Sequence, residues 1–200
     1  MMNHPQISRE EKERHDIGQQ YRFDIINKVN DLLIIMLNKY HASRVAVLEF
    51  HNGGQNISGL PFVKYNMEYE QINIDVKNMN GVIKDLPASV IGPIYADLTD
   101  GSKKFKVYYK EDIEEFKNRS TVLYSYLQEL SVDYIIFAPI YDSNNLMFGV
   151  CCIEYSNTVK PSFVTSKETL DNLIESYKLE LHDDIIRLSN YLTLNKEINK

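Results

Sequence analysis

Apolar residues recur three or four positions apart in two long segments of the chain. The first spans residues 17–40, and the second runs from Ser166 toward the end of the sequence. This spacing places the apolar side chains on one face of an α-helix. We therefore predict a long amphipathic helix at each end. The polar stretch before the first helix can extend it, with Ser8 as a plausible N-cap and Glu11 as its partner three residues later.

Three shorter segments alternate between apolar faces as strands do. In "SRVAVLEFH", residues 43–51, Val45 and Val47 alternate with Ala46 and Leu48, so both faces are apolar. Such a strand is expected in the middle of a sheet that is covered on both sides. Residues 132–156 predict two further apolar strands, joined by the turn "DSNN" at 142–145.

The middle of the chain carries weaker patterns. Residues 62–76 alternate well enough for a second strand, which would form a hairpin arm with the loop at 52–61. We expect a short helix at 86–98, an edge strand at 103–110 and a polar helix at 111–130. Because hairpins dominate, the class is α+β, with a mostly antiparallel sheet flanked by the two long helices. We assign residues 1–16 to a charged N-terminal extension, 17–192 to a single domain and 193–200 to a tail.

The composition is that of a soluble globular protein. Hydrophobic residues make up 44% and charged residues 25% of the 200 residues, and the net charge is −6. An acidic surface without a basic stripe argues against sequence-specific nucleic-acid binding. No apolar run approaches the ~20 residues needed to cross a bilayer, so we expect no membrane contact and a location in a cytosol, the protein's own or a host's. The only two cysteines, Cys151 and Cys152, are adjacent, and we expect packed free thiols on opposite strand faces.

These elements resemble a GAF domain. The resemblance rests on the long first helix, the strand "RVAVLEF" and the closing hairpin with Pro139, the turn at 142–145 and Gly149. It spans residues 17–192. It implies the GAF fold but no single activity, because GAF domains bind cyclic nucleotides, bilins, small metabolites or nothing. A bilin-attaching cysteine outside the last hairpin and the Asn-Lys-Phe-Asp-Glu sequence of the cyclic-nucleotide class are both missing.

A second resemblance concerns "EFHNGGQNISGLPFVKYNMEYE". It is similar to GAF-like virion proteins of crAss-like tailed phages, which implies a ring protein of the portal, neck or tail region. Tyrosine, which occurs 14 times, is favoured in protein interfaces, although core packing explains it equally well.

The candidate ligand-binding residues are Glu49, His51, Asn52, Gly53 and Gly54. His51 could serve as a base if Glu49 oriented it, but no nucleophile is identifiable near it. We favour a turn in which His51 and Asn52 hydrogen-bond a glycine loop, with a ligand-pocket wall as the alternative. The five histidines are scattered, so no metal site is expected.

From these patterns we predict no catalytic residues and no cofactor. The expected function is a non-enzymatic GAF-like interaction protein in a homo-oligomer with other structural proteins, plausibly a virion component assembled in a host cytoplasm. The alternative is a small-molecule-sensing GAF domain in a bacterial cytoplasm that regulates a separate partner protein.

Overall fold

The computed structural model describes residues 9–55, 61–100, 104–158 and 163–198. Within them, a six-stranded sheet has the order β3-β2-β1-β6-β5-β4, and every neighbouring pair is antiparallel. The strands are β1 (Arg44–Gln55), β2 (Pro61–Ile72), β3 (Leu86–Pro87), β4 (Lys106–Tyr108), β5 (Val132–Tyr141) and β6 (Met147–Ser156). The predicted α+β class with an antiparallel sheet is confirmed.

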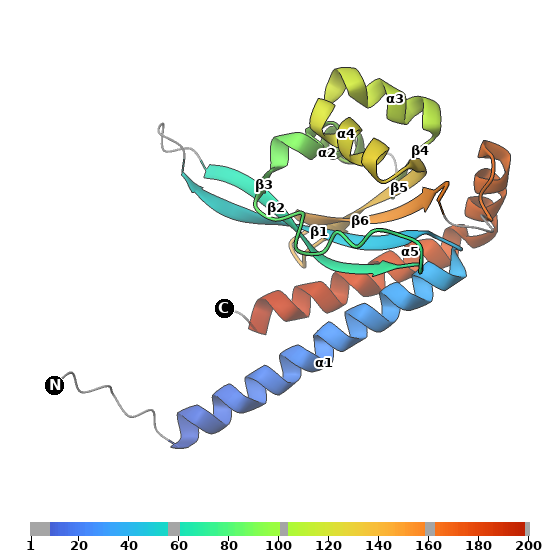
Figure 1. The fold of residues 1–200 in the computed structure, drawn as a ribbon. Helices are drawn as coiled ribbons and strands as arrows, with labels where there is room; N and C mark the ends of the chain where they lie inside the picture. Colours follow the sequence, from blue (N-terminus) through green and yellow to red (C-terminus); the bar gives the residue numbers. More distant parts are fainter. Residues whose placement is uncertain (1–8, 56–60, 101–103, 159–162, 199–200) are drawn as a thin grey trace.

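Helices cover both faces of this sheet (Figure 1). On one face lie α1 (Arg9–Lys39) and α5 (Lys167–Ile198), the two long helices that the sequence predicts. The other face carries the 3₁₀-helix η1 (Ala88–Ile91) and the short helices α2 (Gly92–Thr99), α3 (Lys110–Arg119) and α4 (Thr121–Glu129). The molecule is therefore a three-layer arrangement with the sheet in the middle.

The central strands β1 and β6 are buried on both faces, as their unbroken apolar runs predict. Val45 and Val47 belong to the hydrophobic core under α1 and α5, whereas Ala46 and Leu48 belong to the core under α2 to α4. The two cysteines divide in the same way, since Cys151 faces the first core and Cys152 the second, and both are free thiols.

The structure corrects three predicted elements. The predicted single helix at 111–130 is broken at Ser120, whose backbone is extended and whose Oγ accepts a hydrogen bond from the Leu123 amide as the N-cap of α4. Residues 86–98 open as the short strand β3 and the 3₁₀-helix η1 before α2 begins. Strand β1 continues through Gln55, where a loop from residue 52 was predicted.

Both terminal helices reach past the predicted domain limits of 17 and 192, since α1 begins at Arg9 and α5 ends at Ile198. The predicted N-cap Ser8 and the loop residues 56–60 lie outside the described residues. Helix α5 is bent at Tyr177, where the backbone leaves helical geometry. No helix of the described chain is long and apolar enough to cross a membrane.

The close packing of β1 on β6 predicts the effect of a single methyl group. A Cβ atom at Gly149 would lie 2.7 Å from the carbonyl oxygen of Leu48. Because that oxygen belongs to the backbone of a central strand, it cannot move aside without distorting the sheet. We expect Gly149→Ala to lower the free energy of unfolding by about 1–3 kcal/mol in urea denaturation.

The matched control is Gly18→Ala in α1. Apart from its chain neighbours and the adjoining backbone of its own helix, no described atom lies within 4 Å of the position that its Cβ would occupy. Alanine is also the better helix former, so this variant should gain roughly 0.5–1 kcal/mol. Equal stabilities for the two variants would contradict the register of β1 and β6.

Candidate ligand-binding cavity

A small apolar cavity lies between the sheet and the layer formed by η1 and α4. Its volume is about 40 Å³. The floor comes from strands β1, β2, β5 and β6, and the walls come from the segment before α2 and from α4. The lining residues are Leu48, Tyr65, Met67, Ile83, Leu86, Val90, Ile91, Val122, Leu123, Tyr126, Leu127, Ile135, Phe137, Cys152 and Glu154.

Short elements, η1 and α4, form the outer wall of the cavity. Val122, in the first turn of α4, lines it and is 57% exposed. Leu86 and Val90 on the opposite rim are half-buried, whereas the floor residues are buried. Val122 is therefore the most exposed side chain of the lining.

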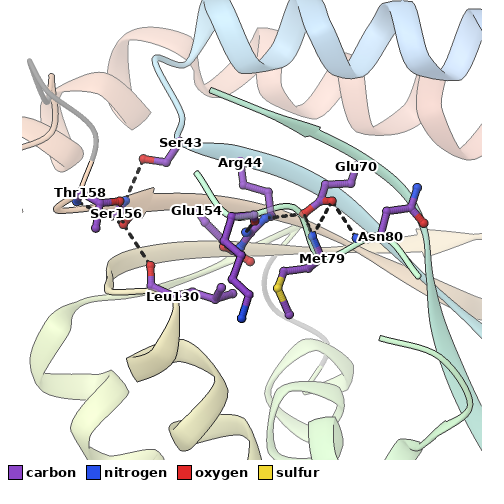
Figure 2. Close-up of polar contacts among 10 residues, drawn as sticks. Ser43, Arg44, Glu70, Met79, Asn80, Leu130, Glu154, Ser156 and Thr158 are labelled. Atoms are coloured by element: carbon purple, nitrogen blue, oxygen red, sulfur yellow. Dashed lines mark hydrogen bonds and ion pairs between the residues drawn. The ribbon is translucent and has the colours of Figure 1, made fainter. Parts of the chain in front are cut away.

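One wall is shaped by the connector between β2 and β3, residues 73–85, which the buried side chain of Glu70 holds in place. Glu70 accepts hydrogen bonds from the amides of Met79 and Asn80, at 2.9 and 2.8 Å (Figure 2). Further along the connector, the carbonyl oxygen of Ile83 accepts a bond of 2.9 Å from the Met67 amide. These contacts place Ile83 in the cavity wall.

Arg44 ties the connector to the sheet. Its guanidinium is 1% exposed and donates to Glu70 Oε1 at 2.7 Å, to the carbonyl of Lys77 at 2.5 Å and to Glu154 Oε2. Figure 2 shows the guanidinium between the two carboxylates, which come from β2 and β6. One buried arginine therefore joins three strands and the connector, which a rigid guanidinium fork does well.

The two carboxylates differ in their surroundings. Glu70 has Arg44 and two backbone amides as donors, but Glu154 has Arg44 alone. Burial raises the pKa of the Glu154 carboxyl above its ordinary value, while Arg44 opposes the rise and Glu70 adds to it. Glu154 also lines the cavity, and among the described residues its Oε1 has no hydrogen-bond partner.

Tyr126 brings a second unpaired polar atom to the same place. Its hydroxyl is buried and has no hydrogen-bond partner in the described structure. Burial raises the pKa of this hydroxyl, and the charge of Glu154 raises it further. The phenol therefore stays protonated at neutral pH. An unsatisfied buried hydroxyl costs stability, which is a reason to look for a ligand that would pair with it.

The residues predicted as ligand-binding do not line this cavity. Glu49 approaches Lys196 of α5, at 3.7 Å between Oε2 and Nζ, and burial raises the pKa of its carboxyl. The His51 Nε2 atom lies 3.1 Å from Asn66 Oδ1 and 3.6 Å from Asp85 Oδ1.

Asn52 is exposed in β1, opposite Val63 of β2. Gly53 and Gly54 also belong to β1. The five positions therefore follow one another along the outer end of a strand, away from the cavity, and their role in binding stays a prediction.

Sequence reasoning missed Arg44, Glu70, Tyr126 and Glu154. One indication was available, because Glu154 interrupts the apolar strand "MFGVCCIEYS" on the same face as Cys152. A charged residue inside a doubly buried strand needs a partner. The partner itself could not be identified, since Arg44 begins a strand 110 positions away and Glu70 lies in a segment with weak alternation.

The orphaned hydroxyl leads to a stability prediction. Tyr126→Phe removes only that group, so we expect the free energy of unfolding to stay unchanged or to rise by up to about 1 kcal/mol. Tyr124→Phe on the same helix is the control, because its exposed hydroxyl donates to Glu114 at 3.0 Å and its removal should lower the stability only slightly. A loss above about 1 kcal/mol in Tyr126→Phe would mean that the hydroxyl is paired.

The buried Glu154 predicts a pH dependence. Because its folded-state pKa is raised, the folded protein binds more protons than the unfolded one as the pH rises from 4.5, and stability falls until the folded-state pKa is passed. Glutamine does not ionise. We therefore compare the free energy of unfolding of the wild type with that of Glu154→Gln by urea denaturation at successive pH values. The wild-type value minus the variant value should decrease as the pH rises from 4.5 to the folded-state pKa of Glu154. If the wild-type value minus the variant value instead grew with pH, the pKa of Glu154 would not be raised in the folded protein.

Comparison with solved structures agrees with this architecture. A phycoerythrobilin-bound GAF domain from a cyanobacterial phytochrome matches with a TM-score of 0.57 at 13% identity, covering 98% of this chain and 100% of its own. A far-red cyanobacteriochrome photoreceptor matches with a TM-score of 0.59 at 14% identity, covering 93% and 96%. The PixJ GAF domain of Thermosynechococcus elongatus matches with a TM-score of 0.55 at 11% identity, covering 91% and 93%.

No protein-family model matches the chain, and no curated protein sequence matches it either. The comparisons do not support the resemblance to phage virion proteins, and nothing in them bears on a homo-oligomer. At such low identities, the structural likeness shows the fold alone. The predicted GAF-like fold is confirmed: this chain has a GAF-like fold.

Proposed function

We propose that this GAF-like domain binds a small molecule in the cavity beneath η1 and α4 and regulates a separate partner protein. The cavity carries the proposal, because its apolar lining includes the buried carboxylate of Glu154 and the unpaired hydroxyl of Tyr126. We place its opening beside Val122, the most exposed side chain of the lining. Ligand sites typically combine an apolar lining with a few well-placed polar groups. The expectation of a virion ring protein has no comparable observation behind it.

The size of the cavity limits the ligand. A water needs roughly 10–15 Å³ of such space, so about 40 Å³ suits only a few non-hydrogen atoms. A bilin, which is bound in the similar phytochrome GAF domain, has four pyrrole rings and is far larger. Both cysteines here lie buried in β6, and only Cys152 lines the cavity.

The proposed role is binding without catalysis. His51 has oxygen atoms of Asn66 and Asp85 as its neighbours, and the described contacts bring no hydroxyl or thiol nucleophile to its ring. Across the described part of the chain, no three histidine, cysteine or acidic side chains group as metal ligands would. The ligand would therefore act by the free energy of its binding.

Ligand binding would be transmitted to a partner protein through α4 and η1, which form the outer wall of the cavity. A ligand that pairs with Tyr126 and packs against Leu123 would stabilise α4, whose exposed side includes Val122. The neighbouring η1 is linked to α4 by Ser120, which donates to the carbonyl of Val90 at 2.7 Å. These two short elements form the surface whose order would depend on the ligand.

Closing the opening tests this proposal. A library of compounds with up to about eight non-hydrogen atoms is tested on the full chain by thermal shift and ligand-observed NMR. Compounds that bind should stabilise the wild type, by about 2.7 kcal/mol at a hundredfold excess over Kd. In Val122→Trp, the indole covers the opening, so these compounds should lose at least about tenfold in affinity.

Leu179→Trp is the matched control, since Leu179 is 77% exposed on α5 and lies on the far side of the sheet. It should bind the same compounds as the wild type does. If no compound binds, or if Val122→Trp binds them equally well, the cavity is not the functional site.

A further inference from the structure

The charges beside the cavity do not balance. One guanidinium, Arg44, faces two carboxylates, Glu70 and Glu154, and among the described residues no other charged side chain pairs with either of them. When both carboxylates are ionised, one negative charge is left without a partner in a buried region. A buried charge is costly unless it is paired, so a cation is the complement that this site lacks.

The unpaired charge faces the cavity. Glu154 is 4% exposed and lines the cavity, and its Oε1 has no partner among the described residues, whereas Glu70 is occupied by Arg44 and the connector amides. Tyr126 also lines the cavity, and its buried hydroxyl has no hydrogen-bond partner in the described structure. Tyr65 adds a second lining hydroxyl, for which the described contacts include no hydrogen bond.

These three oxygens match the chemistry of an ammonium group. An –NH₃⁺ group has three donors and no acceptor, and a carboxylate and two hydroxyls are all able to accept. The remaining walls are apolar, with Leu48, Leu123 and Leu127 buried around the cavity. They offer a place for a short hydrocarbon chain but no donor for a second polar group.

From this arrangement we infer that the cavity ligand is a small primary amine, bound as its ammonium ion between Glu154 and Tyr126 with a short apolar chain against α4. The inference rests on the proposed function and adds the class of ligand. It excludes small carboxylates, since an anion would meet Glu154 with a like charge. A neutral alcohol would satisfy a hydroxyl but leave the charge unpaired.

The test compares three probes of equal length on the full chain: n-butylammonium, 1-butanol and butyrate. Each is titrated by protein-observed NMR at neutral pH and constant ionic strength, with ammonium chloride as the control for unspecific ionic effects. We expect n-butylammonium to bind at least about tenfold more tightly than 1-butanol, because hydrogen bonds to a charged group are the stronger ones. Butyrate should bind most weakly.

The preference should depend on Glu154. In Glu154→Gln the ratio of the amine and alcohol affinities should fall to near one. Glu129→Gln removes an exposed carboxylate that pairs with Lys77 outside the cavity, and it should keep the wild-type ratio. If Glu154→Gln does not fold, the ratio of amine and alcohol affinities in the wild type still tests the inference. Tyr126→Phe is then the second variant, and n-butylammonium should bind to it several-fold more weakly than to the wild type.

The outcomes separate the two proposals. If amine and alcohol bind in the cavity with equal affinity, the amine inference is wrong and the proposed function stands. If neither probe shifts the resonances of the cavity residues, the cavity is not a site for small ligands and both fail. A preference for butyrate would overturn the inference directly.

Discussion

The buried guanidinium of Arg44 is the contact on which the cavity depends. It joins Glu70 of β2 and Glu154 of β6 to its own strand, β1, and it also holds the connector through the carbonyl of Lys77. Removing one partner of a buried ion pair leaves an uncompensated charge and costs roughly 3–5 kcal/mol. The positions of the sheet, the connector and the cavity floor are therefore coupled through one side chain.

The same contact gives the cavity its two kinds of surface. Most of the lining is apolar because it is the part of the second hydrophobic core that α4 and η1 cover. Glu154 is the one member of the Arg44–Glu70–Glu154 cluster that lines the cavity. Arg44 stabilises the carboxylate but is shared with Glu70, so Glu154 keeps an unpaired oxygen. A site that is apolar along its length and polar at one end selects for molecules of the same pattern.

Much of the fold could be predicted from the sequence, because the long helices and the doubly buried strands have strong periodic patterns. Val45 and Ala46 face opposite cores as alternation requires, and Cys151 and Cys152 do the same. The break at Ser120 was missed because the apolar pattern continues across it, although a serine there is a good N-cap.

The site was harder to predict, because it depends on pairs that are distant in the sequence. Arg44 and Glu154 are 110 positions apart, and nothing local to either indicates the other. His51 and the glycines after it attracted attention as a possible site because glycine-rich turns often hold ligands. In the structure these residues lie in a strand, because β1 extends past them to Gln55.

The central claim is that the space between the sheet and α4 is an accessible, mostly apolar binding cavity. Xenon tests this most directly, because it enters dry apolar cavities without needing a polar partner. Methyl resonances of the wild-type protein would be followed by NMR under increasing xenon pressure. The account predicts saturable shifts centred on Leu48, Leu123 and Leu127, which line the cavity. Shifts confined to the core under α1 and α5, or no shifts at all, would contradict it.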